Sequence, residues 1–392
     1  MAAPTINISA FRNAPHSQPL PPAAVEVINE WRQCFVDGPA SVAHILGHGV
    51  STAVIDAACT AGHQFFSESS EAEKLQVAKS AERDGGNRGY RPYGIGSVST
   101  TWSCADGSPF PETEVEAYHR SLNPRPPDLV EQYESLCDEL DPAPTHQPEF
   151  LPALHAYYTA GVDLSKVLMA LTSCALGLPR DYFESAFSEP SELNRLHVAF
   201  SRCGIHAQSP EAIRRGEHTD FESLTVLHHE RGGLQVRIHA SGEWVDVPPV
   251  AGALTITAGD LLQLWSNDRI RSCVHRVTNE TSDRNGQKDA RSRPTASSKL
   301  DGRLSLVLFT GPTPTTLIEP LPTCVSMDNP GRYAPIVATN HVSRKLQASG
   351  NLTPVVSAAP AAAGRPAQPH VLLRRRVFTQ LRGLNTAPTA LP

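Results

Sequence analysis

The chain has 392 residues, of which 40% are hydrophobic, and a formal net charge of −6 at pH 7. This length allows a substantial buried core, and the mildly acidic balance excludes the broad basic surface typical of nucleic-acid binding. No run of about 18 apolar residues occurs, so no membrane-spanning segment is predicted. The eight cysteines are scattered and no secretory leader is recognised at the start, which favours a reducing, cytoplasmic location.

Residues 1–125 are predicted to form a mixed helix and strand region. Alternation predicts a short strand in "PTINISAF", and a buried strand is expected in "VAHILGHGV". Helical spacing of apolar residues predicts helices in "PPAAVEVINEWRQCFVDG" and "STAVIDAACTAGHQFFSES". Residues 126–189 are predicted to form a helical connection that packs on the core, with "LPALHAYYTAGVDLSKVLMALTSCALGL" as its main helix.

Residues 190–320 read as a succession of short β-strands separated by Gly, Pro or charged turns. The runs are "LNRLHVAF", "LTVLHH", "GLQVRI", "EWVDVPPV", "ALTITAG", "DLLQLW", "SCVHRVT" and "RLSLVLFTG". This succession of short strands and turns predicts an antiparallel sandwich or barrel. A long hairpin loop is expected at 278–302, a C-terminal helical segment at 321–353 and a disordered Ala/Pro-rich tail at 354–392.

His218 and Asp220 form an HxD motif. Positions i and i+2 of a strand share a face, so both side chains can point at one metal ion. Two histidines and one carboxylate leave three octahedral positions open, which suits non-haem Fe(II). His275 is the best candidate for the third ligand. His228 and His229 compete, but an extended strand would separate His228 from Asp220 by over ~25 Å, so we interpret both as strand residues.

The ordered pattern "HTDFESLTVL…GGLQV…W.DVPP…GD.L..WSNDR..SCVHRV…RLSLVLF" resembles the 2-oxoglutarate- and Fe(II)-dependent dioxygenases of the isopenicillin N synthase-like family. The resemblance covers about residues 190–320 and continues more weakly through "PTINISAF", "GHGV" and "RGYRPYG". It implies a mainly β fold with flanking helices and a distorted double-stranded β-helix, or jelly roll, as the core. It also implies that His218, Asp220 and His275 are the Fe(II) ligands.

Arg303 and Ser305 form a second i, i+2 pair, in "GRLSLVLF". An arginine within an apolar run needs a partner, and its planar fork suits a carboxylate. In the resembling family this Arg-x-Ser pair binds the distal carboxylate of 2-oxoglutarate.

The sequence departs from the family at its Asn-x-Tyr pair, whose tyrosine helps to hold 2-oxoglutarate. Leu196 and Val198 align with that pair, so a hydroxyl donor is missing. The residues that could compensate are Arg195, His197 and Arg202.

Aromatic and basic residues near the expected pocket mouth are candidate substrate contacts by the same resemblance, although ordinary packing explains them equally well: Arg88, Tyr90, Tyr93, Phe200 and Phe309. Trp244 and Trp265 lie in predicted β-runs and are expected to be packed core aromatics.

The resemblance implies an oxidoreductase of secondary metabolism that uses Fe(II), O2 and 2-oxoglutarate, with ascorbate sustaining activity. Its reaction would oxidise an unactivated C–H of a small-molecule substrate, by hydroxylation, desaturation or ring closure, with release of succinate and CO2. One alternative is an Fe(II) oxidase of the same fold that uses O2 without 2-oxoglutarate, with Arg303 and Ser305 binding a substrate carboxylate. A second alternative is a non-catalytic binding protein, which the intact ligand set disfavours.

Overall fold

The computed structural model describes residues 3–15, 19–80, 86, 88–94, 128–188, 191–202, 214–278 and 302–348. The predicted loop at 278–302, except for its two end residues, and the predicted tail at 354–392 lie outside this described part. Among the described residues, no helix has both the length and the apolar character needed to cross a membrane.

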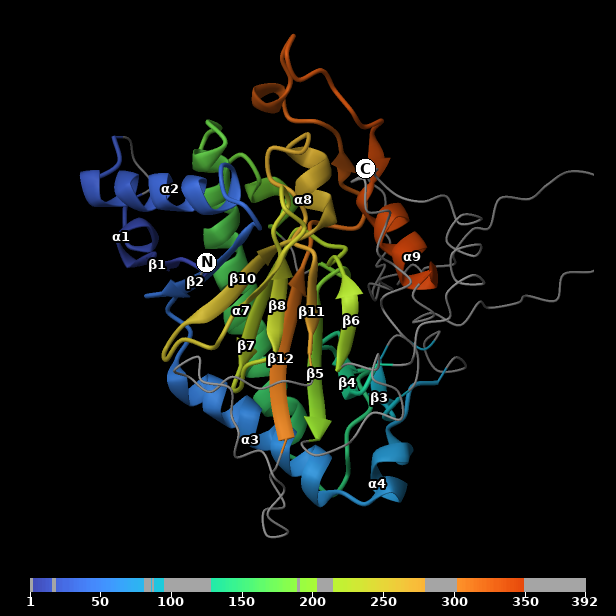
Figure 1. Cartoon of the computed structure of the whole chain (residues 1–392). Helices are drawn as coiled ribbons and strands as arrows, with labels where there is room; N and C mark the ends of the chain where they lie inside the picture. The colour runs from blue at the N-terminus through green and yellow to red at the C-terminus, as the bar shows by residue number, and fades with distance from the viewer. Residues whose placement is uncertain are drawn as a thin grey trace, which may run out of the picture. The chain divides into compact units, whose positions relative to one another are not determined.

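Helices and strands follow one another along the chain as Figure 1 shows. The helices are α1 (Ser9–Arg12), α2 (Pro22–Phe35), α3 (Thr52–Glu68), α4 (Glu71–Gln76), α7 (Phe150–Ala175), α8 (Asp260–Trp265) and α9 (Ala338–Ala348), with 3-10 turns η2 (Glu184–Ala186) and η3 (Pro322–Cys324). The first strands are β1 (Thr5–Asn7), β2 (Val42–Leu46), β3 (Gly89–Arg91), β4 (Glu131–Ser135) and β5 (Arg195–Arg202). The later strands are β6 (Arg215–His218), β7 (Leu224–His229), β8 (Leu234–Arg237), β9 (Trp244–Asp246), β10 (Leu254–Ala258), β11 (His275–Val277), β12 (Gly302–Thr310), β13 (Leu317–Ile318) and β14 (Ile336–Val337).

Two sheets form the core. The larger has eight strands in the order β1-β2-β10-β7-β12-β5-β4-β3, and the smaller has the order β6-β11-β8-β9. Strand β12 lies antiparallel between β5 and β7, with Ser305 opposite both Ala199 and His229. Strands β6, β8 and β11 lie over one face of the larger sheet (Figure 1). Residues from both sheets line one cavity, which is the arrangement of the predicted jelly roll.

Helices α3 and α7 cover the other face of the larger sheet (Figure 1). The two helices lie closest to the sheet at positions where they carry glycine. A Cβ atom at Gly161 of α7 would lie 2.4 Å from Cδ2 of Leu308, and one at Gly62 of α3 would lie 3.0 Å from Cδ1 of Leu304. Side chains alternate along a strand, so residues 304, 306 and 308 of β12 face the helices while 303, 305, 307 and 309 face the cavity.

The predicted helical connection at 126–189 contains a strand of the main sheet, β4, whose sequence is "EQYES". Its five residues are all buried, and it pairs with β3 and β5. Two of its carboxylates form ion pairs with lysines, Glu131 with Lys74 at 2.8 Å and Glu134 with Lys79 at 2.5 Å. A buried strand with this polar composition has no apolar alternation, so the pattern did not indicate it.

The run "DLLQLW", predicted as a strand, is the helix α8. Six apolar-rich residues fit either element, and tertiary hydrogen bonds decide between them. The N–H of Asp260 donates to the carbonyl of Asp220 at 2.9 Å, and that of Leu261 donates to the carbonyl of Glu222 at 3.1 Å. These bonds satisfy N–H groups that the first helical turn leaves without partners.

The two tryptophans have different surroundings. Trp265 is a core aromatic, as predicted, but it lies on α8 and packs against Phe183 and Phe187. Trp244 is only half-buried on β9, with the guanidinium of Arg276 lying 4.1 Å from its ring centroid, so the prediction of a core position was wrong.

A buried charge cluster attaches α9 to the first turn of α8. The Nζ of Lys345 lies 3.3 Å and the Nε2 of His341 lies 3.4 Å from Oδ2 of Asp260. Burial by itself would raise the pKa of Asp260, but the positive charge of Lys345 and the contact with His341 outweigh it and hold that pKa below its usual value.

Replacing Lys345 by methionine should therefore lower the free energy of unfolding by roughly 3 kcal/mol, because it leaves a buried carboxylate without its main cation. Chemical denaturation measures this change. The double variant Lys345→Met with Asp260→Asn should lose less stability than the sum of the two single variants, since it removes both charges together. Additive losses would contradict the coupling.

Candidate metal centre and cosubstrate pocket

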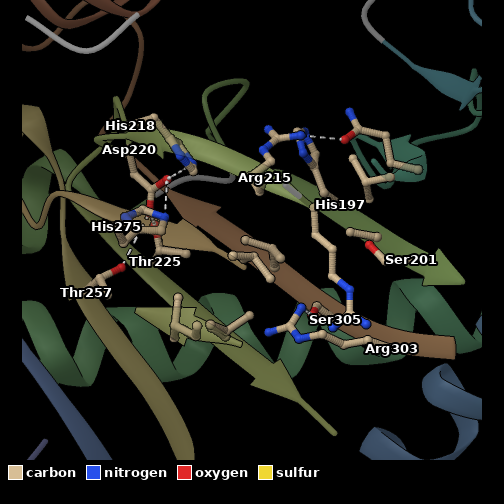
Figure 2. A pocket seen from close by; sticks show the side chains of 18 of the residues that line it. His197, Ser201, Arg215, His218, Asp220, Thr225, Thr257, His275, Arg303 and Ser305 are labelled. Atoms are coloured by element: carbon tan, nitrogen blue, oxygen red, sulfur yellow. Dashed lines mark hydrogen bonds and ion pairs between the residues drawn. The ribbon is translucent and has the colours of Figure 1, made fainter. Parts of the chain in front are cut away.

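A cavity with about 720 Å³ of empty space, including the part open to solvent, lies between the two sheets. Figure 2 shows His218, Asp220 and His275 together at one end of it and Arg303 with Ser305 at the other. Both the candidate metal ligands and the Arg303–Ser305 pair were predicted from the sequence, and the fold brings them to the same cavity.

The three candidate metal ligands come from two neighbouring strands and one turn. His218 ends β6, His275 begins β11, and the two residues are register partners. Asp220 lies in the turn after β6. Its Oδ1 is 3.8 Å from Nε2 of His218 and 3.7 Å from Nε2 of His275, and the three ligand atoms all lie within 4.8 Å of one another.

Neighbouring groups orient these three ligands. Nδ1 of His218 lies 2.8 Å from the carbonyl of Gly216, and Nδ1 of His275 lies 2.9 Å from that of Cys273. A carbonyl only accepts hydrogen bonds, so each Nδ1 carries the proton and each Nε2 keeps its lone pair. Burial, reinforced by the nearby His275, lowers the pKa of His218 well below its usual value, which keeps the ring neutral.

Two threonines, which no sequence pattern indicated, hold Asp220 in place by hydrogen bonds. The hydroxyls of Thr225 on β7 and Thr257 on β10 both donate to Oδ2 of Asp220, which leaves Oδ1 directed at the histidines. Two neutral imidazole nitrogens and one carboxylate oxygen, buried and already oriented, are a donor set that fits ferrous iron.

His228 and His229 lie on a different strand from the HxD motif, because a turn separates β6 from β7. The assumption of one extended strand was therefore wrong. His229 is bonded elsewhere, with Nδ1 at 3.1 Å from the carbonyl of Arg231 and Nε2 at 3.3 Å from the hydroxyl of Thr255. It is a structural residue of the larger sheet.

Arg303 is 5% exposed and Ser305 is 2% exposed, and both side chains line the cavity. The Nε of Arg303 donates to the carbonyls of Arg231 and Gly232, at 3.2 and 3.0 Å, and Nη1 donates to the hydroxyl of Ser305. Burial, together with the charge of Arg214, lowers the pKa of Arg303 to about 9, so the guanidinium stays charged at neutral pH. Two backbone carbonyls fix one edge of the Arg303 guanidinium, and the rest of this group faces the cavity.

Leu196 and Val198, which the sequence alignment places at the Asn-x-Tyr pair, are fully buried on the helix side of β5. The residues of this strand that line the cavity are His197, Ala199 and Ser201, and none of the three is a tyrosine.

Three residues of β5 were candidates to compensate for the missing hydroxyl. Of these, His197 lines the cavity, and burial lowers the pKa of His197 to about 3. Arg202 turns away, with Nε at 3.1 Å from Oε1 of Glu131 and Nη2 at 3.2 Å from the carbonyl of Phe66. Arg195 is buried outside the cavity lining.

The five candidate substrate contacts separate into two groups. Phe309 lines the cavity. Phe200 lies on the helix side of β5 and stacks on Phe66, with ring centroids 5.4 Å apart. The hydroxyl of Tyr90 donates to Glu131, and Arg88 forms an ion pair with Asp138.

Tyr93 is not among the cavity-lining residues either. Four of the five candidates thus lie outside the cavity lining, and packing or ion pairs account for three of them.

Two cavity residues, Arg214 and Arg215, were not identified from the sequence. They stand two residues before the HxD motif, and two adjacent arginines at the start of an inward-facing strand are the signal that could have indicated them. Arg215 is held by Gln132 and Asp128, with Nη1 at 2.9 Å from Oε1 of Gln132 and Nε at 3.8 Å from Oδ2 of Asp128.

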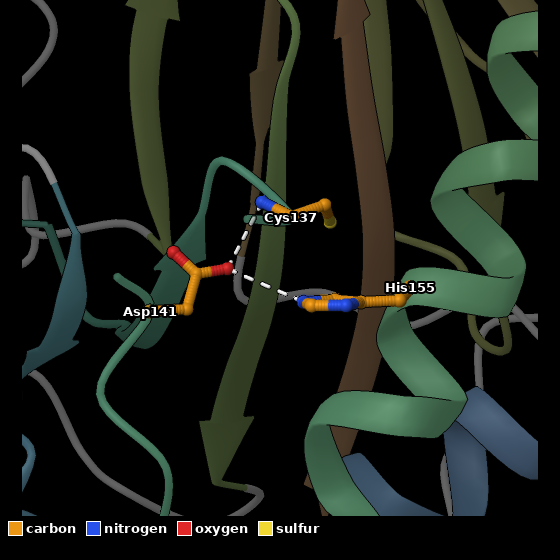
Figure 3. Close-up of side chains that lie close together, drawn as sticks. All are labelled: Cys137, Asp141 and His155. Carbon is orange, nitrogen blue, oxygen red and sulfur yellow. Dashed lines mark hydrogen bonds and ion pairs between the residues drawn. The ribbon is translucent and has the colours of Figure 1, made fainter. Parts of the chain in front are cut away.

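A second group of potential metal ligands consists of Cys137, Asp141 and His155 (Figure 3). The carboxylate of Asp141 accepts hydrogen bonds from the hydroxyl of Ser135 and from two backbone N–H groups, those of Leu136 at 3.2 Å and Cys137 at 2.9 Å. Burial raises the pKa of the Cys137 thiol, which therefore stays protonated and is a poor ligand. We interpret this group as a cap for the turn after β4.

Metal loading should therefore saturate at one Fe(II) per chain. We expect elemental analysis after anaerobic loading and desalting to give the same ratio for the wild type and for Cys137→Ala. Asp220→Ala should lose the ion. A ratio of two that falls to one in Cys137→Ala would show that the second group binds metal.

Comparison with known proteins agrees with this site. Residues 194–312 match the family model of the 2OG-Fe(II) oxygenase superfamily. A 2-oxoglutarate-Fe(II) type oxidoreductase of Metarhizium majus is 28% identical, with 79% of this chain and 78% of that protein covered. Validamycin A dioxygenase of Streptomyces hygroscopicus subsp. limoneus is 26% identical, with 75% and 78% covered.

The fold also has relatives among solved structures. The dioxygenase for auxin oxidation in rice superposes with a TM-score of 0.61 at 19% identity, covering 89% of this chain and 96% of that one. A full-length Neurospora crassa protein, crystallised in complex with alpha-KG, superposes with a TM-score of 0.65 at 22% identity and covers 88% and 96%.

The chain contains a domain of the 2-oxoglutarate–Fe(II) oxygenase superfamily, at residues 194–312, and it resembles an oxidoreductase and a dioxygenase of that class over three quarters of its length. It is an enzyme that uses Fe(II), O2 and 2-oxoglutarate. The predicted family, fold, enzyme class and cofactors are confirmed.

Proposed function

We propose that His218, Asp220 and His275 bind the Fe(II) of this oxygenase. The observation that carries this proposal is the convergence of two Nε2 lone pairs and Oδ1 of Asp220 within 4.8 Å, at the end of a buried cavity. Fe(II) and 2-oxoglutarate together supply O2-dependent oxidation of a substrate C–H, with release of succinate and CO2. Three protein ligands would leave the remaining coordination positions of the ion to the reactants.

Arg303 and Ser305 are proposed to bind the distal carboxylate of 2-oxoglutarate. The guanidinium is buried and fixed along one edge by two backbone carbonyls, so it can meet a carboxylate without reorganisation. A buried cation in this position is stabilised by an anionic ligand, since burial alone disfavours its charge.

The substrate is proposed to be a small, partly apolar metabolite of secondary metabolism. Val130, Val277 and Phe309 give the cavity apolar surface, while Gln132 and Arg215 supply polar groups to its wall. Such walls orient a ligand through a few polar contacts and exclude water around the reacting carbon. The similarity to validamycin A dioxygenase supports a small-molecule substrate. A cytoplasmic location stays a proposal from the cysteine pattern.

A comparison of metabolite mixtures incubated with and without the enzyme tests this function. The enzyme is supplied with Fe(II), ascorbate and 2-oxoglutarate, and the same assay is run with Asp220→Ala as the matched control. We expect an oxidised product that depends on Asp220, with one succinate formed per product. A product that forms without succinate would point instead to an oxidase that does not use 2-oxoglutarate.

A further inference from the structure

The cavity contains a second buried guanidinium beside the proposed cosubstrate site. Arg214 directly precedes β6, is 6% exposed and lines the same cavity as Arg303 and Ser305. β6 pairs with β11 through a register shift, with His218 opposite His275 and Arg215 opposite Val277, which is an irregularity of the β-bulge type. This irregularity puts Arg215 on the cavity side with His218, and Arg214 lines the cavity from the residue before the strand.

Arg214 and Arg303 line the same cavity. Burial, and then the positive charge of Arg214, lower the pKa of Arg303, while the negative charge of Glu230 raises it. Glu230 is itself engaged with His63, at 2.7 Å. Two buried cations that line one cavity repel one another, and a bound anion relieves this repulsion.

Strand β5 pairs directly with β12, with Ser201 opposite Arg303, and supplies few donors to the cavity. Strand β5 presents an imidazole, a methyl group and a serine hydroxyl to the cavity at His197, Ala199 and Ser201. The imidazole of His197 lies 3.5 Å from Glu134 and packs edge-on against Phe309 at 4.8 Å. β5 therefore presents to the cavity no long side chain with a hydrogen-bond donor near Arg303. Arg214 supplies such a donor to the cavity, its charged guanidinium group.

We propose that Arg214 is a second binding residue for the distal carboxylate of 2-oxoglutarate, acting with Arg303 and Ser305 in place of a tyrosine hydroxyl from β5. The inference rests on the proposed cosubstrate site. Arg215 does not share this role, because Gln132 and Asp128 hold its guanidinium.

The test measures binding without turnover. Wild type, Arg214→Met and Arg214→Lys are loaded with Fe(II) under anaerobic conditions and titrated with 2-oxoglutarate, following the visible charge-transfer absorption of the ferrous 2-oxo acid chelate and, independently, calorimetry. Arg214→Met should raise the Kd for 2-oxoglutarate about tenfold or more, as expected for the loss of a charge-assisted hydrogen bond. Arg214→Lys, which keeps the charge but not the fork, should give an intermediate Kd.

A second ligand identifies the group that Arg214 contacts. 2-Oxopentanoate keeps the chelating 2-oxo acid and the carbon chain but lacks the distal carboxylate, so its Kd should be the same for wild type and Arg214→Met. Arg202→Met is the matched control, because Arg202 binds Glu131 outside the cavity, and its Kd for 2-oxoglutarate should equal that of the wild type.

Three results would overturn the inference. They are an unchanged Kd for 2-oxoglutarate in Arg214→Met, equal weakening of both ligands, or weakening of 2-oxoglutarate to the same degree in Arg202→Met. An error in the proposed cosubstrate site itself would give different results. The wild type would then show no chelate absorption with 2-oxoglutarate, or Arg303→Leu would leave the Kd for 2-oxoglutarate unchanged.

Discussion

Replacing Asp220 by alanine is expected to abolish Fe(II)-dependent turnover while the chain still unfolds cooperatively. The substitution removes the only anionic ligand among the three proposed, and the two histidines that remain form a weak site. Elemental analysis should show loss of iron, and O2 consumption should fall to the rate of the iron-free protein.

The stability of this variant follows from the burial of Asp220. The side chain is 4% exposed, and it accepts hydrogen bonds from the hydroxyls of Thr225 and Thr257. Its removal leaves both hydroxyls without this acceptor, so the free energy of unfolding should fall by about 1–3 kcal/mol. Retained iron and retained turnover in this variant would refute the assignment of Asp220 as a ligand.

Replacing Arg303 by leucine is expected to raise the 2-oxoglutarate requirement steeply while iron stays bound. The loss of a two-pronged, charge-assisted contact corresponds to about 3 kcal/mol, or roughly 100-fold in affinity. The KM for 2-oxoglutarate and the anaerobic Kd both measure this change, and elemental analysis confirms that the metal ligands still function.

Ser305→Ala should weaken 2-oxoglutarate binding less than Arg303→Leu, since it removes a single neutral hydroxyl at the same site. Its Kd should rise by roughly fivefold. Leucine at position 303 also removes one donor from the carbonyls of Arg231 and Gly232, so thermal melts of the iron-loaded variant must be compared with the wild type. An unchanged 2-oxoglutarate requirement in a folded Arg303→Leu would show that Arg303 contacts something else.

Residues that act through a short, fixed spacing could be predicted from the sequence. His218 with Asp220, and Arg303 with Ser305, are i, i+2 pairs, and period-2 alternation places such pairs on one face in any strand. His275 could be added because its segment is strand-like and matches the same ordered family pattern. The structure brings all five to one cavity.

Choices that depend on strand pairing could not be predicted in this way. Phe200 and Phe309 are both aromatic residues of core strands, yet only the latter lines the cavity, because the register of β5 with β12 places them on opposite faces. The same register places Leu196 and Val198 on the helix side of β5 and His197 and Ala199 on its cavity side. A shift of one residue exchanges the two faces of a strand, and a sequence alignment with a one-residue uncertainty cannot resolve it.

The amino-acid sequence by itself determined the family, the iron chemistry and the identity of the residues proposed to bind metal and cosubstrate, since local periodicity and an ordered motif carry that information. The tertiary structure alone decided that "EQYES" is a buried strand, that "DLLQLW" is a helix and that Arg214 lines the same cavity as Arg303. Each of these depends on partners far away in the chain, such as Lys74 and Lys79 for β4 or the carbonyls of Asp220 and Glu222 for α8. Long-range pairing of buried polar groups leaves no periodic trace in the sequence.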